Sequence, residues 1–109
     1  MPEFGLSDKT LATVRGILAS CQAVDKAVLY GSRAKGNFKS GSDLDITLIG
    51  AGITPGMLAD LAGRFEDSVI PYQVDLSIQA DIDNPSLLDH IARVGVVFFE
   101  RASVVTAQI

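Results

Sequence analysis

The sequence is poor in cysteine, in long apolar runs and in positive charge, and each shortage excludes a class of protein. Cys21 is the only cysteine, so the chain cannot form an internal disulfide. Its position on an apolar helical stripe predicts a buried structural thiol. No apolar run approaches the roughly 20 residues that a membrane helix requires, so we expect no membrane association. The first residues, MPEFGLSDKT, lack the basic and then apolar pattern of a signal peptide, which predicts a cytoplasmic protein.

The charge balance argues against a protein that grips DNA or RNA. With a net charge of −4 and an isoelectric point near 4.7, the chain lacks the clustered Lys and Arg that neutralise a nucleic-acid backbone. We therefore expect no direct nucleic-acid binding. The exception is a local group of basic residues, Arg33, Lys35 and Lys39, which suits a small polyphosphate better than a duplex.

Length and composition predict one small globular domain. The 109 residues suffice for a single core and leave no room for a second lobe. An apolar content of 48% is typical of a globular chain and not of a disordered one. Because no internal repeat, low-complexity tract or linker interrupts the sequence, we expect a single domain over residues 1–109. Residues 1–6 and 102–109 are expected to be its flexible ends.

Cap residues and apolar spacing predict helices that alternate with strands. Three helices are predicted after start signals at Ser7, Thr54-Pro55 and Asn84-Pro85, and Gly95 ends the third. The apolar residues at helical spacing in these helices are Leu11, Val14, Ile17, Leu18 and Cys21, then Met57, Leu58, Leu61 and Phe65, then Leu87, Leu88 and Ile91. Strands are predicted at residues 26–31, 43–50, 72–78 and 96–100, and a short helix at 32–35.

Two of the predicted strands have one apolar and one polar face. In residues 43–50 and 72–78, apolar side chains alternate with polar ones. Such strands belong to a sheet that helices cover on one side only, which is typical of antiparallel or mixed sheets. The predicted fold class is therefore α+β, with a small mixed or antiparallel sheet and helices on one face. Asp43, Asp45 and Asp75 would share its open face.

Three aspartates on one face predict a metal site. Residues i and i+2 of a strand project from the same side, so Asp43 and Asp45 can converge on a hard cation. Mg²⁺ prefers oxygen ligands at about 2.0–2.1 Å and keeps substrate phosphates in its other positions. Two such ions about 3.5–4 Å apart can stabilise both the attacking and the leaving oxygen of a displacement at phosphorus. Asp75 would complete the ligand set or take the proton of an incoming hydroxyl.

The Gly-Ser pair that precedes these aspartates predicts a phosphate site. Gly31 closes a strand and Ser32 begins a short helix, whose first N–H groups and partial positive charge attract phosphate oxygens. Gly31 has no Cβ and lets the backbone approach a phosphate closely, and Arg33 or Lys35 could neutralise the remaining charge. We add Ser42 of the same loop to the candidate nucleotide-binding residues. Phosphates at one end and metals at the other describe a site for a nucleoside triphosphate.

Each of these features has an ordinary interpretation when it stands alone. An Asp-x-Asp on an alternating strand is usually a solvated polar face, and a Gly-Ser after a strand is usually a turn or a helix cap. Together they form a set that one sheet can assemble. A P-loop is excluded because Asn37 and Phe38 follow Gly36, where that motif requires Lys and then Ser or Thr. His90, the sole histidine, is expected at a helix surface or cap.

The spacing of these residues resembles a known family signature. Gly31-Ser32, ten residues, then Asp43-Leu44-Asp45 resembles the GSx10DxD signature of the DNA polymerase beta-like nucleotidyltransferase superfamily. The wording GSRAKG…SDLDI is most similar to its minimal nucleotidyltransferase (MNT) group, that of the MntA-type antitoxins. The resemblance implies that Asp43 and Asp45 bind divalent metal and that Asp75 completes the catalytic and metal-binding triad. It further implies that Gly31 and Ser32 contact ATP, with two Mg²⁺ ions, or Mn²⁺, as cofactor.

The resemblance also implies a reaction and a partner. Small MNT proteins are paired with a small helical HEPN protein in toxin-antitoxin systems, and transfer AMP from ATP to a tyrosine of the toxin. The alternative is a non-catalytic antitoxin that neutralises its partner by stoichiometric binding, in which the tail SVVTAQI would matter more than the aspartates. A third option, transfer to a small-molecule hydroxyl as in aminoglycoside-modifying relatives, is disfavoured by the missing second domain. An open sheet edge could also support a homo-oligomer.

Overall fold

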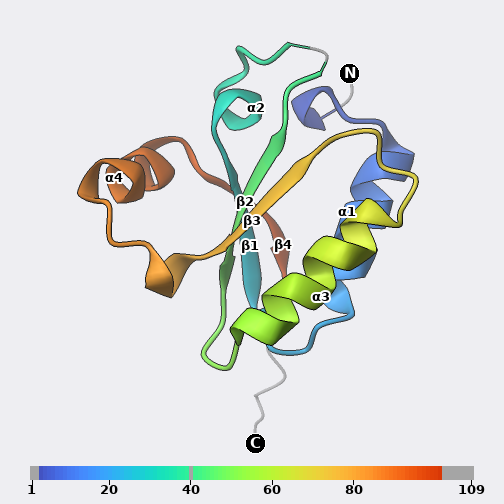
Figure 1. Cartoon of the computed structure of the whole chain (residues 1–109). Helices are drawn as coiled ribbons and strands as arrows, with labels where there is room; N and C mark the ends of the chain where they lie inside the picture. Colours follow the sequence, from blue (N-terminus) through green and yellow to red (C-terminus); the bar gives the residue numbers. More distant parts are fainter. Residues whose placement is uncertain (1–2, 40, 102–109) are drawn as a thin grey trace, which may run out of the picture.

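The computed structural model describes residues 3–39 and 41–101, which form one sheet flanked by helices (Figure 1). The elements in chain order are η1 (Glu3–Gly5), α1 (Asp8–Ala19), β1 (Lys26–Tyr30), α2 (Ser32–Lys35), β2 (Leu44–Ile49), α3 (Pro55–Glu66), β3 (Val74–Ile78), η2 (Gln79–Asp81), α4 (Pro85–Val94) and β4 (Val96–Glu100). Each predicted helix and strand is present, with bounds that differ from the prediction by only a few residues.

The sheet is mixed, which confirms the predicted α+β class. Its strand order is β3-β2-β1-β4. Strand β1 is antiparallel to both β2 and β4, whereas β2 and β3 are parallel. Parallel neighbours require a crossover connection, and α3 provides it. The two inner strands therefore come from a hairpin-like pair, and β3 joins them from a distant part of the sequence.

Side-chain caps start the three long helices where the sequence predicts. The Ser7 hydroxyl accepts a hydrogen bond from the Thr10 N–H at the start of α1. Thr54 and Asn84 cap α3 and α4 in the same way, each followed by a proline at the first helical position. These caps satisfy N–H groups that have no partner within the helix, so the helix starts are set locally.

The main core lies between the sheet and the pair α1 and α3, which cover one face (Figure 1). Strand β2 contributes Leu44, Ile46 and Leu48, each at most 1% exposed, which confirms the predicted alternation. Met57 differs from the prediction because it is 38% exposed. The inner stripe of α3 runs through Leu58, Leu61 and Phe65, and Met57 precedes that stripe by one residue, or about 100° of helix.

The fourth helix covers part of the opposite face, which the sequence expected to be open. Helix α4 lies on the other side of the sheet from α1 and α3 (Figure 1). There Ile91 packs in a second buried cluster with Val28 and Tyr30 of β1. Strand β1 is buried on both faces, since Ala27 also belongs to the main core, and its second apolar face requires a cover. Consequently α4 lies beside the predicted site.

The ends of the chain are only partly described. Leu6 is buried and Phe4 packs against the core, so these two residues of the segment 1–6, which was expected to be flexible, are part of the packed structure. Residues 1, 2 and 40 and the tail at 102–109 lie outside the described residues, and so does the predicted role of that tail. Cys21, predicted to be buried, is half-buried at the edge of the core. None of the helices in the described ranges has the length and apolarity needed to span a membrane.

Candidate active site

The first two aspartates lie at the start of β2. Asp43 immediately precedes the strand and is exposed, and Asp45 is half-buried within it. Leu44 and Ile46 alternate with them and point into the core. Because side chains alternate between the faces of a strand, Asp43 and Asp45 lie on the face opposite α1 and α3.

The third aspartate reaches the same face through the parallel pairing of β2 with β3. Asp45 is the register partner of Asp75, as Leu44 is of Val74 and Thr47 of Ser77. The Ser77 hydroxyl donates a hydrogen bond of 2.9 Å to Thr47 Oγ1, and Thr47 is fully buried. This hydroxyl pair, one step further along the same face, helps to fix the register that places Asp75 beside Asp45.

The three carboxylates interact electrostatically. Burial raises the pKa of Asp45 above its ordinary value, and the neighbouring Asp75 and then Asp43 raise that pKa further, against a smaller lowering effect from His90. Like charges disfavour ionisation of their neighbours. A divalent cation between the carboxylates would relieve this repulsion, and carboxylate oxygens are the ligands that Mg²⁺ prefers. The donor set therefore fits a hard cation.

The carboxylates do not by themselves form a closed cation cage. Among residues 3–39 and 41–101, no three His, Cys, Asp or Glu side chains are grouped closely enough to hold a metal ion. Asp43 and Asp75 are exposed, and exposed side chains retain rotamer freedom. These carboxylates would hold an ion only together with waters or substrate phosphates, which Mg²⁺ usually keeps among its ligands.

The turn that follows β1 lies directly against Asp45. Tyr30, the last residue of β1, is the register partner of Asp45, so Gly31 and Ser32 begin beside the acidic residues. Gly31 has φ 77° and ψ −157°, a conformation that is essentially restricted to glycine. A Cβ on Gly31 would collide with the Asp45 carboxylate. The sequence predicted a glycine here so that a phosphate could approach the backbone closely. In the structure the group that lies close to Gly31 is the Asp45 carboxylate.

Arg33 has a different environment from the one that the sequence suggests. It is only 2% exposed, and its guanidinium donates hydrogen bonds to the carbonyl oxygens of Ser42, at 3.0 Å, and Phe4, at 2.8 Å. The guanidinium carbon also lies 4.4 Å from the ring centre of Tyr72 and 5.0 Å from that of Phe38. Arg33 thereby fastens α2 to the segments that lead into Asp43 and Asp75. The sequence had suggested an exposed side chain that neutralises phosphate.

The other candidate phosphate ligands lie on the loop around α2. Lys35 is exposed in the last turn of α2, which ends at Gly36 in a left-handed conformation. Ser42 is half-buried, and its hydroxyl accepts a hydrogen bond of 2.8 Å from the Lys39 N–H. Ser42 therefore shapes the loop just before Asp43, and Lys35 is the exposed cation of this helix.

Two residues near the site were not assigned to it from the sequence. His90 of α4 accepts a hydrogen bond of 3.1 Å from the Gly31 N–H, although a surface or capping role was expected. Tyr30 is 9% exposed, and burial raises the pKa of its hydroxyl, as do Asp45 and Asp75, whereas a hydrogen bond with Ser77 lowers it. No local motif marks either residue, since the His90 contact depends on α4 covering this face and the Tyr30 contacts depend on residues of β2 and β3.

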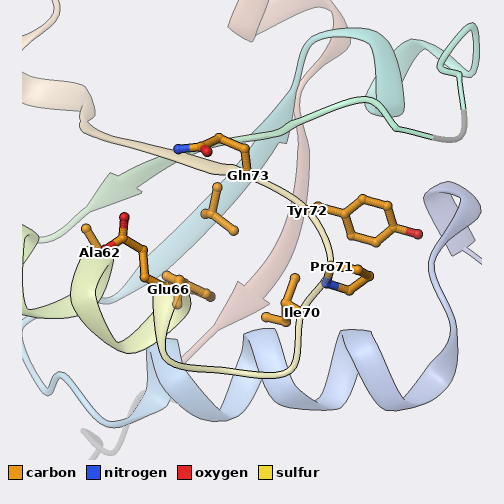
Figure 2. A pocket seen from close by; sticks show the side chains of 8 residues that line it. Ala62, Glu66, Ile70, Pro71, Tyr72 and Gln73 are labelled. Carbon is orange, nitrogen blue, oxygen red and sulfur yellow. The ribbon is translucent and has the colours of Figure 1, made fainter.

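A hollow lies on the other side of the sheet from the aspartates. This hollow of about 540 Å³ is lined by Phe65 and Glu66 at the end of α3, by Ile70, and by Tyr72 to Val74 at the start of β3 (Figure 2). Val74 packs toward the main core, whereas Asp75, the next residue, points to the opposite face. The hollow is therefore not part of the acidic site.

Comparison with known proteins identifies similar folds. A family model described as "Polymerase beta, Nucleotidyltransferase" matches residues 12–103. A toxin-antitoxin structure with AMP-PNP is similar with a TM-score of 0.69 and 19% identity, over 84% of this chain and 73% of that chain. A tri-AMPylated Shewanella oneidensis HEPN toxin in complex with an MNT antitoxin matches with a TM-score of 0.66 and 16% identity, over 88% and 74%.

A putative nucleotidyltransferase from Sulfolobus solfataricus is also similar, with a TM-score of 0.51 and 23% identity over 85% of this chain and 82% of that chain. At these identities the likeness to solved structures demonstrates a shared fold. No curated protein sequence matches the chain.

Proposed function

The chain belongs to the polymerase beta nucleotidyltransferase family, and on this premise we propose that it transfers AMP from ATP to a hydroxyl group of a partner protein. The observation that carries the proposal is the in-register pair of Asp45 and Asp75. This pair shares a face of the sheet with Asp43 and is adjoined by the Gly31-Ser32 turn. Acidic ligands and a phosphate-binding turn on one face are the two parts that nucleotidyl transfer requires.

Each residue of the candidate site has a separate proposed role in binding ATP. The backbone and hydroxyl of Ser32 bind the triphosphate, and Lys35 neutralises part of its charge. Asp43, Asp45 and Asp75 would hold Mg²⁺, which would stabilise the charge that develops on the phosphate oxygens. Arg33 is buried and does not bind the nucleotide in this proposal. Its hydrogen bond to the Ser42 carbonyl oxygen fixes the loop that ends at Asp43. Gly31 keeps the turn close to Asp45.

The transfer itself is a displacement at phosphorus. The acceptor hydroxyl attacks the α-phosphorus, a new P–O bond forms, the bond to the β-phosphate oxygen breaks, and pyrophosphate leaves. Asp75 is exposed and lies beside Asp45, so it can accept the proton of the attacking hydroxyl. The acceptor must approach this face, which α4 covers only in part.

We further propose that the acceptor is a tyrosine of a small HEPN-type protein and that this chain is the antitoxin of the pair. The support is the similarity of fold to the MNT antitoxin that forms a complex with a tri-AMPylated HEPN toxin, together with the AMP-PNP present in a second toxin-antitoxin neighbour. A tyrosine hydroxyl is a chemically suitable nucleophile once Asp75 accepts its proton.

The experiment is a labelling reaction with α-³²P-ATP, Mg²⁺ and the protein encoded by the neighbouring gene, which the proposal expects to be of the HEPN type. Label on the partner, lost when its acceptor tyrosine is changed to phenylalanine, is the expected result. The double variant Asp43→Asn and Asp45→Asn should bind the partner but not label it. If that variant neutralises the toxin as well as the unaltered protein does, the chain acts by stoichiometric binding and the transfer proposal fails.

A further inference from the structure

The histidine of α4 makes a contact at the centre of the candidate site. Its Nε2 atom accepts the 3.1 Å hydrogen bond from the Gly31 N–H, and the two residues are 59 positions apart in the sequence. His90 is half-buried, so the contact is partly shielded from competing water.

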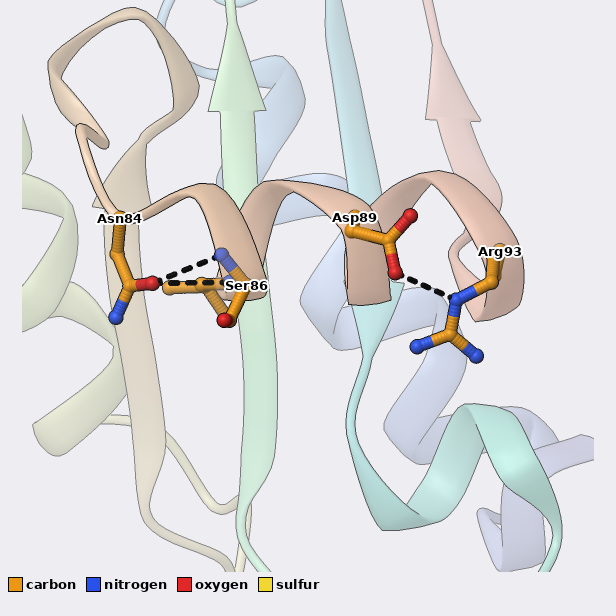
Figure 3. Close-up of polar contacts among 5 residues, drawn as sticks. Asn84, Ser86, Asp89 and Arg93 are labelled. Carbon is orange, nitrogen blue, oxygen red and sulfur yellow. Dashed lines mark hydrogen bonds and ion pairs between the residues drawn. The ribbon is translucent and has the colours of Figure 1, made fainter.

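Several contacts fix the position of this imidazole. The ring meets the Tyr30 ring edge-to-face, with centroids 6.2 Å apart and an interplanar angle of 80°. The next residue, Ile91, is buried against β1. At the start of α4 the Asn84 side chain accepts hydrogen bonds from the Ser86 and Leu87 N–H groups, and Figure 3 shows this cap together with the outward ion pair of the helix.

Gly31, the residue that His90 contacts, gains conformational restriction from this hydrogen bond. Glycine has more backbone freedom than any other residue and loses more entropy when it is fixed. Gly31 is held at φ 77° and ψ −157°, and it must remain close to the Asp45 carboxylate. An acceptor that holds its N–H therefore fixes the peptide plane from which Ser32 begins.

We propose that His90 is a positioning residue, which holds the Gly31-Ser32 turn in the geometry that receives the nucleotide phosphates. This inference rests on the proposed function for its consequence but not for its contact. The Gly31 N–H is occupied by His90, so phosphate oxygens are bound by Ser32 and the groups that follow it. Helix α4 thereby contributes to the nucleotide site through the contact of His90 with Gly31.

The test compares variants that keep or remove the acceptor. In His90→Gln the amide oxygen can occupy the place of Nε2, whereas His90→Asn is too short to reach it and His90→Leu keeps the bulk without an acceptor. Arg93→Gln is the control, because Arg93 is exposed on the same helix and forms an ion pair with Asp89 (Figure 3). All variants are made in the full chain.

Two measurements decide the outcome. The first, without nucleotide, is the hydrogen-exchange rate of the Gly31 amide, which should rise about tenfold in the Leu and Asn variants, the factor that corresponds to about 1.4 kcal/mol. In the His90→Gln and Arg93→Gln variants the Gly31 amide should exchange at the same rate as in the unaltered protein. The second is the affinity for AMP-PNP with Mg²⁺, which should fall about tenfold in the same two variants at unchanged stability to urea.

Each result separates the two proposals. A Gly31 amide that stays equally protected in both His90→Leu and His90→Asn overturns the inference. Increased exchange with unchanged affinity for AMP-PNP also overturns it, since the contact would then be structural only. If the unaltered protein does not bind AMP-PNP at all, the proposed function fails, while the exchange measurement still decides whether His90 holds the turn. Should the Leu variant fail to fold, the comparison of Gln with Asn decides alone.

Discussion

The Asp45 carboxylate occupies the space in which a side chain on Gly31 would begin. The two residues belong to different segments, one at the end of β1 and one within β2, and the antiparallel register makes them neighbours. The contact joins the proposed phosphate-binding turn and the proposed metal-binding carboxylates into one unit, so a change on either side should affect the other.

Replacement of Gly31 by alanine should destabilise the protein and disrupt the site. The backbone conformation alone costs of order 1–3 kcal/mol for a residue other than glycine, and the collision with Asp45 adds to it. Gly36→Ala is the matched control, since Gly36 also has a positive φ but nothing near its Cβ position. Its loss should be about 1–2 kcal/mol. Urea unfolding measures both.

A second variant isolates the collision. With Asp45→Ala already present, the extra cost of Gly31→Ala should fall to that of backbone strain, which a double-mutant cycle would record as a coupling energy. Equal losses for Gly31→Ala in the presence and absence of the Asp45 side chain would show that the two residues do not compete for space.

Asp45→Asn should stabilise the protein in the absence of metal at neutral pH. The folded-state pKa of Asp45 is raised, chiefly by burial and then by Asp75 and Asp43, so the folded protein holds this proton more tightly than the unfolded chain does. Its contribution to stability is complete below the ordinary pKa of about 3.9 and is lost as the pH rises through the raised value. Asparagine remains neutral and avoids this loss.

The melting temperature in EDTA, measured across the acidic range, checks this. The Asn variant should melt higher than the unaltered protein near neutral pH, and the difference should shrink as the pH approaches about 3.9. Asp89→Asn, which alters an exposed ion pair of α4, should not show this pH-dependent gain. A lower melting temperature for Asp45→Asn at neutral pH would contradict the electrostatic account.

Arg33→Lys should cost stability even though the charge is retained. Lysine cannot reproduce the planar fork that reaches the carbonyl oxygens of both Phe4 and Ser42. Loss of one hydrogen bond from a charged group corresponds to about 1.5–3 kcal/mol. Lys35, which is exposed on the same helix, is the contrasting case. Lys35→Gln should change stability by less than about 0.5 kcal/mol but should weaken AMP-PNP binding, because it removes a positive charge proposed to face the phosphates. Urea unfolding measures the stability of both variants, and calorimetric titration measures their affinity for AMP-PNP. An Arg33→Lys variant of unchanged stability, or a Lys35→Gln variant of unchanged affinity, would contradict this account.

Mg²⁺ with AMP-PNP should stabilise the unaltered protein through the aspartates. A ligand that binds only the folded state at 100 times its Kd adds about 2.7 kcal/mol. Asp43→Asn should require more Mg²⁺ to reach the same melting temperature, whereas Asp60→Asn, at an exposed ion pair of α3, should not. An Asp43→Asn variant with an unchanged Mg²⁺ requirement would remove Asp43 from the proposed ligands.

Much of this fold is predictable because its signals are local. The caps at Ser7, Thr54 and Asn84 act within a few residues, and the alternation in β2 is predictable because every second residue of that strand points into the main core. The pairing of Asp45 with Asp75 is less local, but two polar-faced strands in one small sheet leave few other arrangements.

What could not be predicted depends on contacts between distant segments. The burial of Arg33 follows from where Phe4 and Tyr72 come to lie, and neither position is encoded near Arg33. In the same way His90 reaches Gly31 only because β1 has a second apolar face that α4 covers. A charged or titratable residue looks solvent-exposed in sequence until the elements that enclose it are placed.

The parallel pairing of β2 with β3 has a consequence for kinetics. Asp45 and Asp75 are separated by the whole of the α3 crossover, and closing so long a loop costs entropy before any contact across it forms. Closure also brings two like charges together. The acidic pair therefore forms only after the crossover has packed onto the sheet. A ligand bound there should slow unfolding and leave the rate of folding unchanged.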